Sequence, residues 1–216
     1  MQYQYIIGIG SNLPSSQYQT PLETCQAALH QLQENPLIHH DAQMLHIVDI
    51  SRWYRCPPVP VSDQPWFVNA VFRCISALPP EQCLLWLHKI EQDFERIRRT
   101  RNEARTLDLD MILQIDETLH RPTQLQNHVP NIPNLQHFSS LQEMQHLLNY
   151  KTDIAPIIPH PRMTNRHFVL YPLQDIFVNF RHPETNKHIY ELIAELDPSY
   201  EIYPIDMDTR SLHFAK

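Results

Sequence analysis

The chain of 216 residues has only two glycines, Gly8 and Gly10, against 19 prolines. A Walker-type phosphate-binding loop needs glycines at fixed spacing, so it is excluded here, and phosphate groups must be bound mainly by side chains. The two glycines lie close together, which indicates that their backbone positions matter. They favour either a tight strand-to-helix turn for packing or a turn that brings backbone N–H groups near a ligand.

Excess positive charge is also lacking, since 17 Lys and Arg residues stand against 24 Asp and Glu residues, a formal net charge of −7. We therefore expect no nucleic acid as partner. The four cysteines form no C-x-x-C pair, which favours reduced thiols over disulfides or zinc ligands. No apolar run approaches about 18 residues, and no signal peptide is evident. We expect a cytoplasmic protein that does not contact the membrane.

The length of 216 residues favours one domain, residues 1–216, and hydrophobic periodicity predicts both strands and helices in it. Residues 114–153 are rich in Gln, His, Asn and Pro, and so long a connection is typical of an inserted segment or lid. Thr20-Pro21-Leu22-Glu23 is a capping box and predicts a helix start. Strands are predicted at 3–10, 45–54, 66–75 and 107–113, and further helices begin near Pro79, near Met163 (ending near Pro172) and at Ile189.

A pair of acids follows the densest positive charge in the chain. Asp108 and Asp110 alternate with apolar residues in a predicted strand, so their side chains project from the same face. Two neighbouring carboxylates repel each other unless a cation or protons lie between them, and Mg²⁺ is typically held by one or two carboxylates and substrate phosphates. Five of the 17 basic residues lie between Arg96 and Arg105. The pattern predicts a metal and phosphate site, or else an edge strand paired with a solvated basic loop.

A second group of residues suits a flat ligand. In the alternating strand at 66–75, Phe67 and Asn69 share the mixed face. An amide can pair with the edge of a polar heterocycle while an aromatic ring stacks on its face. The proline-rich run from Cys56 to Pro60 would form a rigid wall. The alternatives are an ordinary strand surface and a plain connector.

Six blocks of residues, taken in order, resemble the 6-hydroxymethyl-7,8-dihydropterin pyrophosphokinase family. The resemblance covers residues 3–113 and 155–196, and its most specific motifs are R-x-L-D-L-D at 105–110 and P-H-x-x-M-x-x-R. The blocks are Gly8-x-Gly10-Ser11-Asn12-Leu13, Tyr54-Arg55-x-Pro57-Pro58, Gln64-Pro65-x-Phe67-x-Asn69, Glu91 with Arg96-x-Arg98, Arg105-x-Leu107-Asp108-Leu109-Asp110, and Pro159-His160-Pro161-Arg162-Met163-x-x-Arg166-x-Phe168.

The resemblance implies an α+β, ferredoxin-like sandwich with a mainly antiparallel sheet flanked by helices. It implies transfer of pyrophosphate from ATP to the pterin hydroxymethyl group, releasing AMP in folate biosynthesis, with two Mg²⁺ ions. We expect a monomer that takes only small-molecule substrates. The implied residues fall into three sets. The catalytic set is Arg96, Arg105, Asp108 and Asp110, of which the two acids hold the metal; the ATP set is His88, Glu91, Arg98, His160 and Arg166; the pterin set is Cys56, Pro57, Pro58, Val59, Phe67, Asn69 and Phe168.

The chain departs from the family pattern in the segment Arg96–Arg105, called the arginine loop below. The family usually has Trp-x-Pro-Arg before the paired acids, whereas this chain has Asn102-Glu103-Ala104-Arg105. Loss of the indole removes an apolar cover over the pterin pocket, which leaves a catalytically impaired pterin- or nucleotide-binding relative as the alternative. A ferredoxin-like RNA-binding module would need exposed aromatics in basic strands. The net charge of −7 and the lack of such a strand disfavour it. A DxD sugar-nucleotide transferase explains neither Asn69 nor His160.

Overall fold

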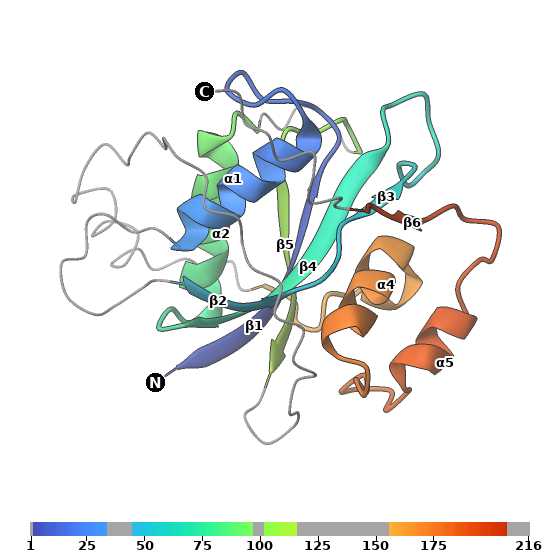
Figure 1. The fold of residues 1–216 in the computed structure, drawn as a ribbon. Helices are drawn as coiled ribbons and strands as arrows, with labels where there is room; N and C mark the ends of the chain where they lie inside the picture. The colour runs from blue at the N-terminus through green and yellow to red at the C-terminus, as the bar shows by residue number, and fades with distance from the viewer. Residues whose placement is uncertain (1, 34–44, 97–101, 116–155, 207–216) are drawn as a thin grey trace.

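The structure, a computed structural model, describes residues 2–33, 45–96, 102–115 and 156–206. Most of the predicted insertion at 114–153 therefore lies outside the described residues. The described part forms one six-stranded sheet with helices on both of its faces (Figure 1). Its elements are β1 (Tyr3–Ser11), α1 (Pro21–Gln33), β2 (Leu45–Ile50), β3 (Tyr54–Cys56), β4 (Phe67–Ser76), α2 (Pro80–Asp93), β5 (Asp108–Ile115), a 3₁₀ turn (Met163–Asn165), α4 (His167–Ile176), α5 (Ile189–Ala194) and β6 (Tyr203–Pro204).

The sheet has the strand order β5-β1-β4-β3-β6, and β2 also pairs with β4. All of these pairs are antiparallel. With β2 and β3 taken as one interrupted strand, the central part has the order of a ferredoxin-like sheet. The predicted α+β class with a mainly antiparallel sheet is thus confirmed.

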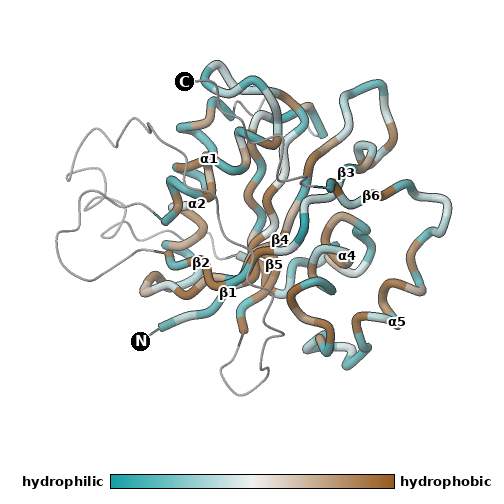
Figure 2. The backbone as a smooth tube through the Cα atoms, in the orientation of Figure 1, coloured by the Kyte–Doolittle hydropathy of each residue, from teal (hydrophilic) through white to brown (hydrophobic). Residues whose placement is uncertain are grey.

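Each face of the sheet packs on its own pair of helices. Successive side chains of a strand point to opposite faces, so Ile7 and Ile9 pack in the core beneath α1 and α2, whereas Ile6 belongs to the core beneath α4 and α5. Apolar stretches concentrate where the helices meet the sheet (Figure 2). The capping box at the start of α1 is confirmed, because Glu23 N–H donates to Thr20 Oγ1 and the Glu23 carboxylate accepts from Thr20 N–H.

Three local predictions are corrected. The strand predicted at 45–54 is divided into β2 and β3 by residues 51–53, and its continuation pairs with β4 as far as Cys56. Pro172 lies inside α4 without ending it, since buried Leu173 and Ile176 continue the core-facing stripe. Gly10 is not in a turn: it lies within β1 and is paired on both sides.

Candidate active site

Two glycines form the floor of the site. In β1, Gly10 is paired with Asp108 of β5 on one side and with Asn69 of β4 on the other, and Gly8 is paired with Asp110. A Cβ on Gly10 would lie 2.7 Å from Asn69 Oδ1, closer than real contacts allow. Glycine is therefore required at residue 10 so that the Asn69 amide can lie over the middle strand.

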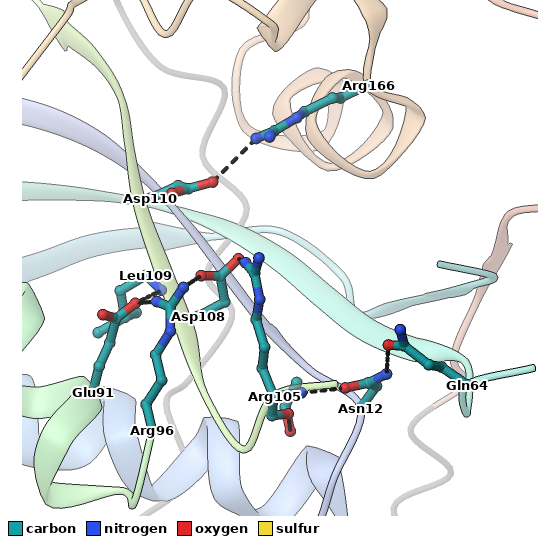
Figure 3. A network of polar contacts seen from close by, with 10 residues as sticks. Asn12, Gln64, Glu91, Arg96, Arg105, Asp108, Leu109, Asp110 and Arg166 are labelled. Atoms are coloured by element: carbon teal, nitrogen blue, oxygen red, sulfur yellow. Dashed lines mark hydrogen bonds and ion pairs between the residues drawn. The ribbon is translucent and has the colours of Figure 1, made fainter. Parts of the chain in front are cut away.

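The acid end of the site is neutralised by arginines (Figure 3). Asp108 accepts two guanidinium groups: Arg96 Nη2 lies 2.6 Å from its Oδ1, and Arg105 Nη1 lies 2.5 Å from its Oδ2. Asp110 is paired with Arg166 at 3.0 Å. Burial raises the pKa of Asp110, but the charges of Arg166 and Arg105, and that of His160 when its imidazole is protonated, outweigh this effect and hold the pKa below its usual value. Asp110 is therefore ionised at neutral pH and available to a cation.

Glu91 links α2 to β5, the strand that carries Asp108 and Asp110. Its side chain is only 2% exposed, and its Oε1 accepts from the Leu109 backbone N–H at 2.8 Å and pairs with the Arg96 guanidinium. The same carboxylate thus fixes the strand segment between Asp108 and Asp110 and holds Arg96 against Asp108. Glu91 was expected to contact ATP, and that assignment stays a prediction. The structure shows Glu91 as a buried partner of Arg96 that also lines, together with His88, a second cavity of about 360 Å³.

Asn12 anchors the loop that carries Arg105. Its side-chain Oδ1 accepts from the Arg105 backbone N–H at 2.6 Å, and its backbone N–H donates to the Arg105 carbonyl at 3.0 Å. The Asn12 side-chain amide also donates to the Pro65 carbonyl. It donates to the Gln64 side chain as well (Figure 3). Asn12 therefore couples the arginine loop to the connection that leads into β4, although it was not assigned a site role from the sequence.

The opposite end of the site is apolar and held by neutral hydrogen bonds. Asn69 is buried, and its Nδ2 donates to Cys56 Sγ at 3.2 Å, which leaves Oδ1 over Gly10. Burial raises the pKa of the Cys56 thiol to about 11, so this sulfur is neutral at physiological pH. The Phe168 ring faces Arg166, whose guanidinium carbon lies 5.3 Å from the ring centroid.

One cavity of about 440 Å³ contains both ends, a size typical of small-molecule sites. All seven residues expected at the pterin and all four expected to be catalytic line it, together with His88 and Arg166. His160 is not among its lining residues, and Arg98 lies outside the described residues. The lining comprises Cys56, Pro57, Pro58, Val59, Phe67, Asn69, His88, Arg96, Asn102, Glu103, Arg105, Asp108, Asp110, Arg162, Asn165, Arg166 and Phe168.

His160 lies behind Asp110 and has a lowered pKa. Its backbone N–H donates to the Ile112 carbonyl at 2.8 Å, and its Nδ1 accepts from the Arg162 N–H. Burial lowers the His160 pKa most, and the charges of Arg166 and Arg162 lower it further, against an opposite effect of Asp110. A neutral imidazole with an accepting Nδ1 is therefore the form that this region stabilises.

Sequence reasoning missed four lining residues: Asn102, Glu103, Arg162 and Asn165. Arg162 was within the quoted P-H-x-x-M-x-x-R motif, so its position beside His160 was the available signal. Asn102 has a φ of 59°, a left-handed conformation that asparagine tolerates better than most residues, and its carbonyl accepts from Gln64 Nε2 at 2.8 Å. Nothing in the sequence indicated that conformation.

The carboxylates suit a metal that is shared with a ligand rather than one enclosed by protein. Among the described residues, no group of three or more His, Cys, Asp and Glu side chains is placed to hold a metal ion. Asp108 and Asp110 alone supply two hard oxygen donors on one face of β5. That donor set fits Mg²⁺, which usually completes its octahedron with water and substrate phosphates.

An antiparallel α+β sandwich with an acid–arginine pair facing an amide and two aromatics defines a class of phosphoryl-transfer site. The sequence model of the family described as 7,8-dihydro-6-hydroxymethylpterin-pyrophosphokinase matches residues 6–178, and the chain belongs to this family. Its relatives include the 2-amino-4-hydroxy-6-hydroxymethyldihydropteridine pyrophosphokinases of Pseudomonas aeruginosa and Haemophilus influenzae. The first is 31% identical over 188 residues, 87% of this chain and 88% of the relative; the second is 30% identical over 170 residues, 79% of each.

A solved wild-type HPPK-DHPS protein of Plasmodium falciparum has the same fold, with a TM-score of 0.55 at 13% identity. The match covers 90% of this chain but 44% of the Plasmodium chain, so this chain spans less than half of that protein. The family match confirms the predicted family and the predicted class of enzyme, an ATP-dependent pyrophosphokinase. Nothing in these comparisons supports the catalytically impaired alternative. In the part of the chain that the structure describes, no helix is long and apolar enough to span a bilayer.

Proposed function

We propose that the cavity binds ATP at its acid–arginine end and 6-hydroxymethyl-7,8-dihydropterin at its amide end, and transfers the terminal pyrophosphate between them. The observation that carries this proposal is the placement of Asp108 and Asn69 on either side of Gly10 in one cavity. A phosphate-binding region and a heterocycle-binding region are then one strand apart, on the same face of the sheet.

At the amide end, Asn69 would pair with the polar edge of the pterin, and Phe67 and Phe168 would stack on its two faces. Residues 56–59 would close the side of the ring. Because the prolines restrict the backbone, this wall needs little ordering when the ligand binds. The pterin would thus be oriented with its hydroxymethyl group toward the acid end.

At the acid end, the metal would replace the arginines as the partner of the carboxylates. Asp108 and Asp110 would hold two Mg²⁺ ions, which when bound neutralise charge on the triphosphate. The guanidinium groups of Arg96 and Arg105, now paired with Asp108, would then be free to contact phosphate oxygens. Arg166, His88 and His160 would lie at the nucleotide, and Glu91 and Arg98 belong to the same proposed set.

The reaction itself would be an in-line displacement at the β-phosphorus. A bond forms between the pterin hydroxymethyl oxygen and this phosphorus, the bond from the phosphorus to the α,β-bridging oxygen breaks, and AMP leaves with that oxygen. The hydroxyl proton is released to solvent or phosphate. The residues contribute positioning and charge stabilisation rather than a covalent intermediate.

Release of AMP from ATP, Mg²⁺ and hydroxymethyl-dihydropterin tests the proposal directly. We expect Asp108→Asn and Asp110→Asn to lower turnover by roughly a thousandfold, because each removes a negative ligand for the metal. Asp93→Asn is the matched control, since Asp93 pairs with Lys89 on the surface of α2. Near-normal turnover of folded Asp108→Asn would refute the metal role. Titration with Mn²⁺ in the presence of an unreactive ATP analogue should give two ions per chain.

We also propose that residues 1–216 act as one monomeric, cytoplasmic domain into which 114–153 is inserted. Four buried free cysteines suit a reducing compartment. Sedimentation of the chain at increasing concentration tests the monomer: a concentration-independent mass near 25.6 kDa is expected.

A further inference from the structure

A segment after α5 packs behind the proposed pterin wall. Residues 197–206 lie beyond residues 6–178, which match the family, and they include β6. β6 pairs with β3, so that Arg55 is opposite Tyr203, and Ile205 N–H donates to the Trp53 carbonyl at 2.7 Å. The segment is therefore fixed to the strand that leads directly into the wall.

Tyr200 reaches the wall itself. Its hydroxyl donates to the Pro57 carbonyl at 2.6 Å and is also hydrogen-bonded to the Cys56 thiol. Pro57 and Pro58 have no N–H groups, so the wall has few donors of its own with which to fix its backbone. A donor supplied from elsewhere in the chain therefore has a large influence on where this backbone lies.

The Tyr200 ring connects the wall to the helix on the other side of the pocket. It stacks on His167, with ring centroids 4.4 Å apart. His167 Nε2 lies 2.8 Å from the Asp197 carbonyl, an oxygen that can only accept, so Nε2 carries the proton. His167 is the first residue of α4 and immediately precedes Phe168, which lines the pocket.

Tyr200 thus contacts the backbone of one pocket wall and the residue next to the aromatic of the other. Tyr200 is not among the residues that line the described cavity. Burial and the hydrogen bond with Cys56 both raise the pKa of its phenol, which keeps the hydroxyl protonated and able to donate. The side chain has the position of a brace between two walls rather than that of a ligand contact.

We infer that Tyr200 is a positioning residue for the pterin: its hydroxyl and ring set the separation between the 56–59 wall and Phe168. The inference rests on the proposed placement of the pterin between these groups. Because the Tyr200 contacts described here are made with the pterin walls and not with the carboxylates, Tyr200 should govern the affinity for pterin and leave that for ATP unchanged.

Steady-state AMP release with pterin and ATP varied separately tests the inference. Tyr200→Phe keeps the stacked ring and removes the hydroxyl, so we expect the pterin KM to rise about threefold to tenfold, the range for one lost hydrogen bond. Tyr200→Ala removes both contacts and should raise it further. The KM for ATP should stay within about twofold in both variants. Tyr190→Phe is the matched control, because Tyr190 is an exposed tyrosine of α5.

The outcomes separate the inference from the proposed function. If the unmodified chain releases no AMP and does not change the fluorescence of hydroxymethylpterin on titration, the proposed function fails. If that chain is active and Tyr200→Phe has an unchanged pterin KM, the brace is refuted. Equal rises in both KM values together with a lower Tm would show general destabilisation and would also refute it. If Tyr200→Ala does not fold, Tyr200→Phe decides alone.

Discussion

The two ends of the cavity are built in opposite ways. The acid end consists of charged side chains that neutralise one another: Arg96 and Arg105 on Asp108, and Arg166 on Asp110. The amide end consists of a proline-restricted backbone and of Asn69, which is held by a neutral sulfur. The first arrangement must change when phosphates and cations bind, whereas the second needs little change to receive a flat ring.

The difference follows from the cost of burying charge. A partly buried carboxylate needs a cationic partner, so a site that is to hold a metal must provide another cation while the metal is not bound. Arginine serves both states, since its guanidinium group pairs with carboxylate or with phosphate. A heterocycle-binding end has no such charge to neutralise, and rigidity there lowers the entropy lost on binding.

Among replacements at Arg96, Gly10 and His160, that of Arg96 should have the largest effect. Arg96→Ala removes the group that pairs with Asp108 and would move to the phosphates, so we expect turnover to fall by about a hundredfold or more while ATP affinity falls far less. Arg96→Lys, which keeps the charge but not the forked geometry, should recover part of the loss. The measurements are kcat for AMP release and the Kd of an unreactive ATP analogue.

Equal losses in kcat and in ATP affinity would instead make Arg96 an anchor of the bound nucleotide. Because the Arg96 side chain is only 9% exposed and pairs with buried Glu91, the Tm of each variant must be recorded alongside. A large drop in Tm would assign the loss to folding.

Gly10→Ala should disturb the amide end alone. Its Cβ would meet Asn69 Oδ1 at 2.7 Å and force the amide aside, so we expect pterin affinity to fall about tenfold with ATP affinity nearly unchanged. Gly8→Ala is the matched comparison: its Cβ meets Ile112 at an ordinary 3.5 Å. Direct titration with hydroxymethylpterin measures both variants. Equal effects at residues 8 and 10 would contradict the requirement at Gly10.

The smallest effect concerns the pH dependence of stability at the acid end. The folded state lowers the His160 pKa below 6.5, first by burial and then by the Arg166 charge. As the pH falls below 6.5, the unfolded chain takes up this proton before the folded chain does, so the free energy of unfolding decreases. His160→Gln should flatten that decrease, as measured by urea unfolding from pH 7.5 down to about pH 5.

His182 has a pKa that burial lowers in the same way, so some pH dependence should remain in the His160→Gln protein. An NMR titration of the His160 ring gives an independent check. A pKa above 6.5 for this ring would contradict the assignment of a neutral imidazole.

Residues with strong local patterns were the ones that sequence could place. β1 and β4 follow from alternation, the start of α1 from its capping box, and the shared face of Asp108 and Asp110 from the period of two. The ion-pair partners of the acids could be expected only as a group, because Arg96 and Arg166 lie outside β5 and reach Asp108 and Asp110 through tertiary packing.

Features set by long-range contacts could not be predicted. Gly10 was interpreted as a turn residue, since the sequence does not show that Asn69 lies across from it. Glu91 shared a face with other polar residues of α2, and only the fold shows that this face meets the Leu109 backbone. The two residues of β6 are too short a strand to give a periodic signal.

Strand β1, which carries Gly10, sets the distance between the two ends of the cavity. Neighbouring strands lie about 4.8 Å apart, so the backbone of Asp108 and that of Asn69, on either side of Gly10, are separated by about 10 Å. This spacing is fixed by backbone hydrogen bonds and is independent of side-chain motion. The sheet would therefore select the molecule that accepts the pyrophosphate by the distance between its ring and its hydroxyl group. A hydroxyl on a longer or shorter arm than that of the pterin would miss the phosphorus, however well its ring fitted.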